Sequence, residues 1–169
     1  GAPGSSRNFR REWLRFAAVQ FPSARFIGKG DMDTFVYADD LLSAIRDVPA
    51  GAQSVYGGIA NDYYICAAVG GGISHPRIEE CPKGWIFMQG GLYFLSQNLV
   101  QWLGRTDNAM VRFHEGFGME DILVGRCLHH SGMRVMYLDW GHSRPAWLHP
   151  RKNISVFYKL HAESKERGT

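Results

Sequence analysis

The chain has few cysteines, the residues that stabilise small domains through disulfides or bound zinc. It contains three cysteines in 169 residues, at Cys66, Cys81 and Cys127. Their spacing is not that of a zinc ribbon, and their number is too small for a disulfide scaffold. One disulfide with one spare thiol is compatible with the sequence, which does not select the pair, so the redox compartment stays open.

The sequence also gives no sign of a signal peptide or a membrane span, and it does not specifically suggest a nucleic-acid surface. Residues 1–6 are small and have no apolar core, which predicts an internal or engineered start. Residues 84–104 carry no formal charge, but their amide and hydroxyl side chains would be costly in hydrocarbon, which favours a buried strand followed by a helix. The basic stretch 7–11, in a chain of net charge +3, indicates a solvated helix start.

What is present is enough apolar material for one core, because 45% of the residues are hydrophobic and 13% aromatic. Apolar spacing predicts helices over 9–19, around 41–45, from a Ser96 cap through 103, and from 120 to a stop at Gly132. Short apolar runs predict strands at 26–27, 55–58, 92–95, 135–138 and 154–158. This alternation favours an α/β fold.

The same pass along the chain predicts one domain with two tails. Residues 1–8 are expected to form a flexible tail, residues 9–163 the domain, and residues 164–169 a frayed end. Residues 59–83 have no clean period, so we expect a long surface excursion there.

Two carboxylates follow directly after the first predicted strand. Asp31 and Asp33 come after Phe26-Ile27 and two glycines, which places them at the carboxyl end of a strand, where open α/β sheets bind ligands. Two hard oxygen ligands this close suit Mg²⁺ or Mn²⁺ that also holds phosphate oxygens. An Asp-x-Asp taken alone is more often a solvated turn, so the motif needs support from the rest of the chain.

A second acidic pair opens a predicted helix. Glu120 and Asp121 follow a glycine-broken loop at 115–119. Acids in the first turn of a helix usually complement the helix dipole. By itself this pair does not establish a site.

Three separated motifs resemble one family. In chain order they are Lys29-Gly-Asp31-Met-Asp33-Thr-Phe35 followed by Leu41-Leu42, then Gly90-Gly-Leu-Tyr93-Phe-Leu-Ser96, then Glu120-Asp121-Ile-Leu-Val-Gly125-Arg-Cys127-Leu128. They are similar to the β-1,3-galactosyltransferases and Fringe-like inverting glycosyltransferases, and the last motif is the most specific. The resemblance covers residues 13–161 and implies an α/β GT-A fold, here its C-terminal part, with a mixed sheet flanked by helices.

The resemblance also implies an activity. It implies a hexosyltransferase that moves galactose or N-acetylglucosamine from a UDP-sugar to a glycan acceptor on a glycoprotein or glycolipid and forms a β-1,3 linkage. Mn²⁺ is the implied cofactor, with Mg²⁺ as the alternative, and nucleic acid is no partner. The family works in the Golgi lumen as type II membrane proteins, so a membrane anchor and a first nucleotide-binding βαβ unit are expected upstream of this sequence.

On the donor side, the resemblance assigns Asp31 and Asp33 to the metal and diphosphate motif. The glycine pair Gly90 and Gly91 matches positions beside the bound donor. His161 resembles a late histidine that can complete the metal site, with His142 and His149 as competitors, and a neutral imidazole is an acceptable Mn²⁺ ligand.

On the acceptor side, Asp121 matches the acid that serves as catalytic base, and Glu120 would support the acceptor pocket or the geometry of the base. The residue types fit the chemistry: a cation neutralises charge on the departing UDP while a carboxylate on the opposite side takes the acceptor's proton. Two positions depart from the family pattern. Leu92 stands where a second glycine is expected, and Met32 replaces a middle acid.

Two rival classes remain open from the sequence. One is an inactive fragment or pseudoenzyme that keeps the fold as a binding module. The other is a metal-dependent hydrolase acting on a sugar nucleotide, which the aspartate pair alone would permit.

Overall fold

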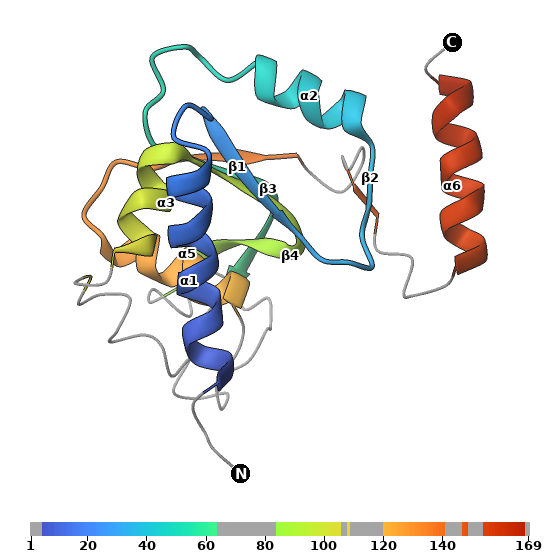
Figure 1. The fold of residues 1–169 in the computed structure, drawn as a ribbon. Helices are drawn as coiled ribbons and strands as arrows, with labels where there is room; N and C mark the ends of the chain where they lie inside the picture. Colours follow the sequence, from blue (N-terminus) through green and yellow to red (C-terminus); the bar gives the residue numbers. More distant parts are fainter. Residues whose placement is uncertain are drawn as a thin grey trace.

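The computed structural model describes residues 5–63, 84–105, 108, 120–140, 147–148 and 154–167. Its elements are α1 (Ser5–Gln20), β1 (Phe26–Gly30), β2 (Phe35–Val36), α2 (Ala38–Arg46), β3 (Val55–Tyr63), β4 (Trp85–Ser96), α3 (Gln97–Gly104), α5 (Glu120–His130), β5 (Met136–Asp139), β6 (Trp147–Leu148) and α6 (Ile154–Arg167). Figure 1 shows helices arranged around a central sheet, so the expected α/β class is confirmed.

The central sheet is mixed, as expected. Its strand order is β1-β4-β3-β5, in which β4 runs antiparallel to both β1 and β3, and β5 runs parallel to β3. A separate small antiparallel sheet pairs β2 with β6. The long strand β4 therefore lies at the centre, with β1 and its acidic end on one side.

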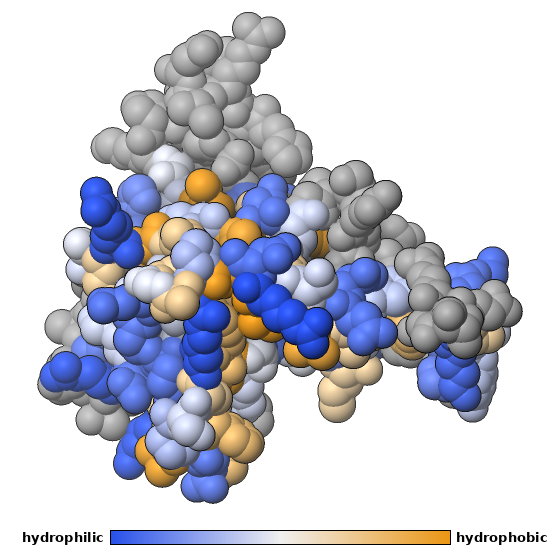
Figure 2. Space-filling model, turned by 90° about the horizontal axis from the view of Figure 1, so that it is seen from above, coloured by the Kyte–Doolittle hydropathy of each residue, from blue (hydrophilic) through white to orange (hydrophobic). Residues whose placement is uncertain are grey.

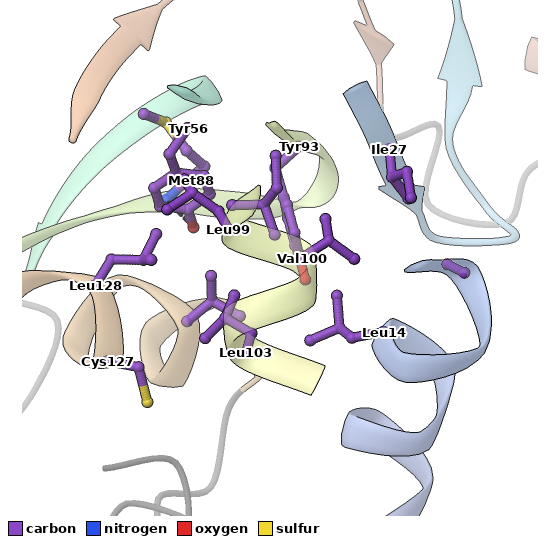
Figure 3. Close-up of a cluster of buried hydrophobic side chains, with 13 residues drawn as sticks. Leu14, Ile27, Tyr56, Met88, Tyr93, Leu99, Val100, Leu103, Cys127 and Leu128 are labelled. Carbon is purple, nitrogen blue, oxygen red and sulfur yellow. Dashed lines mark hydrogen bonds between the residues drawn. The ribbon is translucent and has the colours of Figure 1, made fainter. Parts of the chain in front are cut away.

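The two faces of the central sheet are covered by different helices. Side chains of successive strand residues point to opposite faces, so Tyr93 and Leu95 of β4 join the core beneath α1, α3 and α5, whereas Phe94 packs toward Leu41 and Ile45 of α2. Figure 3 shows the first of these clusters, to which those three helices and strands β1, β3 and β4 contribute. Full burial of each large apolar side chain there stabilises the fold by about 1.5–3 kcal/mol.

The outer surface is of mixed character on the face that Figure 2 presents, where hydrophilic and hydrophobic residues intermingle. Among the helices that the structure describes, none is long and apolar enough to cross a membrane.

The strand predicted at 154–158 was wrong, because this segment opens helix α6. Its β-branched and aromatic residues have high strand propensity, but the residues that follow are mostly good helix formers. Within the helix, Leu160 is buried while Tyr158 is exposed, and Lys159 lies 3.8 Å from Glu163 one turn later. Helical spacing therefore outweighs local strand propensity here.

Other boundaries differ by a few residues from the sequence-based ones. Strand β3 continues to Tyr63, so the first five residues of the excursion predicted at 59–83 belong to the sheet, and residues 64–83 lie outside the described part. Helix α1 begins at Ser5, inside the predicted tail 1–8. Helix α6 likewise includes residues up to Arg167 of the segment predicted to fray.

The junction of β4 and α3 depends on Ser96, which was expected to cap α3. Ser96 stands at the cap position, but its side chain makes no capping hydrogen bond. Its hydroxyl oxygen instead accepts the Val55 N–H at 2.9 Å and donates to Asn98 Oδ1 at 2.7 Å. The residue thus joins β4 to β3 at the start of the helix.

Helix α5 approaches β4 so closely that Gly125 has no room for a side chain. A Cβ at Gly125 would lie 2.5 Å from the Ile86 carbonyl oxygen and 2.5 Å from Phe87 Cβ. Overpacking against backbone costs about 3 kcal/mol, which exceeds the gain of about 1 kcal/mol that alanine brings to a helix. We expect Gly125→Ala to lower the free energy of unfolding by about 2 kcal/mol in urea denaturation.

Gly51→Ala is the matched control, because a Cβ there meets nothing within 4 Å. This variant should unfold at the wild-type urea concentration. If Gly125→Ala unfolded there as well, the close packing of α5 on β4 would be contradicted.

Candidate active site

The first acidic motif lies at the last rung of the ladder between β1 and β4. The Asp31 N–H donates to the Gly91 carbonyl oxygen at 3.0 Å, one residue beyond the end of β1. The chain then turns, because the Thr34 N–H donates back to the Asp31 carbonyl oxygen at 3.1 Å. Asp31 and Asp33 therefore lie in a turn at the carboxyl end of a strand, as the sequence predicted.

Opposite this turn, β4 departs from regular pairing with β3. Gly58 faces Tyr93 and Ala60 faces Met88, so residues 89–92 of β4 lie opposite Ile59 alone. Such irregularities re-aim backbone groups and are frequent beside active sites. The glycine pair falls inside this stretch.

The irregular stretch of β4 places a backbone donor on Asp121. The Gly90 N–H donates to Asp121 Oδ2 at 3.0 Å, and the Ile122 N–H donates to Asp121 Oδ1 at 2.8 Å. A Cβ at Gly90 would lie 3.2 Å from Asp121 Oδ2, so a side chain there would press on the carboxylate. The two motifs, which are 31 residues apart, are thus joined by a direct hydrogen bond.

Glu120 is held by a buried tyrosine. The Tyr93 hydroxyl donates to Glu120 Oε1 at 2.6 Å. Burial, and then the nearby Glu120 charge, raise the pKa of Tyr93 well above its ordinary value, so the phenol remains a donor at neutral pH. The side chain of Glu120 therefore has a fixed place at the start of α5.

Lys29 connects the two acidic motifs. Its Nζ lies 2.6 Å from Asp31 Oδ1, 3.2 Å from the Gly90 carbonyl oxygen and 3.8 Å from Glu120 Oε2. The side chain is only 20% exposed. One ammonium group therefore lies between the carboxylate that ends β1 and the carboxylate that opens α5.

Lys29 and Tyr93 both lie within the sequence motifs, but the motifs alone assign no role to either residue. For Lys29 a signal existed: residues two apart on a strand share a face, which puts Lys29 beside Asp31. No local signal connects Lys29 or Tyr93 to Glu120, because those contacts form only in the folded sheet.

The donor set partly fits a divalent cation. Asp31 and Asp33 offer carboxylate oxygens in a partly buried turn, and Mg²⁺-type ions commonly use one or two carboxylates plus substrate phosphates and water. Within the described ranges, no group of three or more His, Cys, Asp or Glu side chains could hold a metal. The chemistry therefore fits an open site that a diphosphate would complete.

His161 is not brought to this site by the structure. It is exposed on α6, which Figure 1 draws apart from the sheet. The structure does connect other predicted site residues, through hydrogen bonds and through Lys29: Asp31, Gly90, Gly91, Glu120 and Asp121. The role of His161 stays a prediction.

The chain is similar to a known protein family. A protein-family model described as Galactosyltransferase matches residues 11–139. This range includes all three motifs and ends before His161. No curated protein matches the chain.

Proposed function

Because the chain belongs to the galactosyltransferase family, we propose that it carries the active site of an inverting hexosyltransferase. The mixed α/β sheet flanked by helices is the GT-A-like fold that its motifs imply. The proposed donor is a UDP-sugar carrying galactose or N-acetylglucosamine, and the proposed acceptor is a glycan that gains a β-1,3 linkage. The proposed compartment is the Golgi lumen.

The observation that carries this proposal is the hydrogen bond between Gly90 and Asp121. It places the acid of the third motif against the glycine pair of the second. The neighbouring Gly91 carbonyl oxygen accepts the Asp31 N–H, so both acidic motifs contact the same two-residue stretch of β4. A displacement reaction needs this arrangement of a cation-binding side and a base side.

Asp121 has the hydrogen bonds of a positioned base. Each of its oxygens accepts one backbone N–H, which orients the carboxylate, and each oxygen keeps a further lone pair. A remaining lone pair can accept the proton of the acceptor hydroxyl as that oxygen attacks the sugar. No enzyme-bound intermediate is required, and one displacement inverts the anomeric centre.

The donor side uses Asp31 and Asp33. These residues would hold Mn²⁺ or Mg²⁺, which supplies positive charge to the departing diphosphate when bound. Gly90 is partly exposed and has no Cβ, so a donor could approach its backbone closely, whereas Gly91 is buried.

The test is acceptor-dependent release of UDP, measured on this chain and on the protein encoded by the whole open reading frame. UDP-galactose, UDP-N-acetylglucosamine and UDP-glucose serve as donors. We expect release that requires both a glycan acceptor and Mn²⁺. Release without an acceptor would favour the hydrolase, and no release from any donor would favour a binding module.

A further inference from the structure

We propose that Lys29 is an internal counter-ion that neutralises Asp31 until a divalent cation displaces the ammonium toward Glu120. The inference rests on the proposed cation site at Asp31 and Asp33. It adds a residue that controls how readily that site fills.

Lys29 and a divalent cation at Asp31 would compete for the same carboxylate. Lys29 Nζ lies 2.6 Å from Asp31 Oδ1, which is the distance of a charge-assisted hydrogen bond. A divalent cation ligated by Asp31 would need the same carboxylate and would repel the ammonium group. Because the lysine side chain is 20% exposed, water screens this repulsion less than it would on an open surface.

The Lys29 ammonium group has another place to go. The Gly90 carbonyl oxygen is 3.2 Å from Lys29 Nζ, and Glu120 Oε2 is 3.8 Å away. An ammonium group has three donors on a flexible four-carbon stem, so a small rotation shortens the contact with Glu120 while the one with Asp31 lengthens.

Glu120 is held in a position where it can pair with the displaced ammonium group. Its other oxygen, Oε1, accepts the Tyr93 hydroxyl at 2.6 Å. Glu120 is itself partly buried, with 24% of its side chain exposed. When the Lys29 ammonium group moves away from Asp31, it therefore remains paired with Glu120, and no partly buried charge is left without a partner.

The consequence is a link between the two sides of the active site. Filling of the cation site transfers positive charge toward Glu120, the neighbour of the proposed base Asp121. Such coupling is reciprocal, so whatever removes Glu120's charge must also change how well the cation competes with Lys29.

The test measures Mn²⁺ binding to the 169-residue chain without nucleotide, by the electron paramagnetic resonance signal of free Mn²⁺. Lys29→Met should tighten binding about five- to tenfold, because it removes the competing charge and keeps the alkyl stem. Lys29→Gln should do the same while keeping a donor for the Gly90 carbonyl. Lys159→Met is the matched control, because it removes an equal charge from the exposed face of α6 and should leave binding unchanged.

A double-mutant cycle tests the displacement toward Glu120. Glu120→Gln should weaken Mn²⁺ binding several-fold in the wild type and clearly less in Lys29→Met, because only the wild type has an ammonium group to receive. If Glu120→Gln lowered the Mn²⁺ affinity equally in the wild type and in Lys29→Met, Glu120 would act only through its general electrostatic effect. The proposed displacement of Lys29 would then be overturned.

The outcomes separate this inference from the proposed function. If neither Lys29 variant tightens Mn²⁺ binding although both melt like the wild type, the role of Lys29 is overturned and the cation site stands. If the wild type binds no Mn²⁺ even with UDP present, the cation site falls, and the counter-ion role falls with it.

Discussion

Replacement of Asp121 by asparagine is expected to lower acceptor-dependent turnover by about a hundredfold or more, the usual contribution of a general base. The amide keeps the size of the side chain but accepts no proton at neutral pH. Donor affinity should barely change, because the role proposed for Asp121 is to take the acceptor's proton and not to hold the donor. The measurement is steady-state UDP release at saturating donor and acceptor.

The structure refines what this variant does to stability. Both Asp121 oxygens accept backbone N–H groups, from Gly90 and Ile122. An asparagine retains one acceptor and turns an NH₂ group toward the other N–H, which costs about 1–2 kcal/mol. Thermal unfolding of Asp121→Asn must therefore be measured beside its activity, and the assay run well below its melting temperature.

Glu120→Gln is the control for the loss of a charge at the start of α5. Its amide oxygen can still accept the Tyr93 hydroxyl, so the side chain keeps its main anchor. Its turnover should fall much less than that of Asp121→Asn. A fully active Asp121→Asn enzyme, or a product that NMR assigns to the retained anomeric configuration, would contradict the inverting mechanism.

The sequence predicted the elements that carry local signals. A strand at 26–27 followed by two acids, and a helix around 41–45, both appear in the structure. The stop of α5 was also visible, because Gly132 adopts a φ of 72°, a conformation that other residues avoid.

The connections within the site could not be predicted from local signals. Gly90 reaches Asp121 because β4 bulges against β3, and that bulge depends on pairing between strands far apart in sequence. The contact of Lys29 with Glu120 likewise needs β1, β4 and α5 to be in place. The resemblance to known motifs placed these residues in one family, whereas only the folded sheet shows that a lysine lies between them.

The segment at 154–158 shows the converse error. Its composition favours a strand locally, but Leu160 supplies the buried contact of a helix, and the charged residues that follow stabilise helical spacing. If the apolar spacing had been read over one more helical turn beyond residue 158, it would have indicated a helix.

Substitution of Asp33 by asparagine is expected to reduce the gain in UDP affinity that Mn²⁺ provides by about tenfold or more, because it removes a charged oxygen ligand from an open site with few others. Isothermal calorimetry of UDP binding, with Mn²⁺ and then with a chelator, measures that gain. Asp39→Asn is the matched control: it removes the same charge from an exposed position in the first turn of α2 and should leave the gain intact. Wild-type protein that binds UDP equally well with and without Mn²⁺ would contradict a cation site shared with the diphosphate. A gain that survives in Asp33→Asn and disappears in an Asp31→Asn variant would instead assign the cation to Asp31 alone, the carboxylate that Lys29 neutralises in this structure.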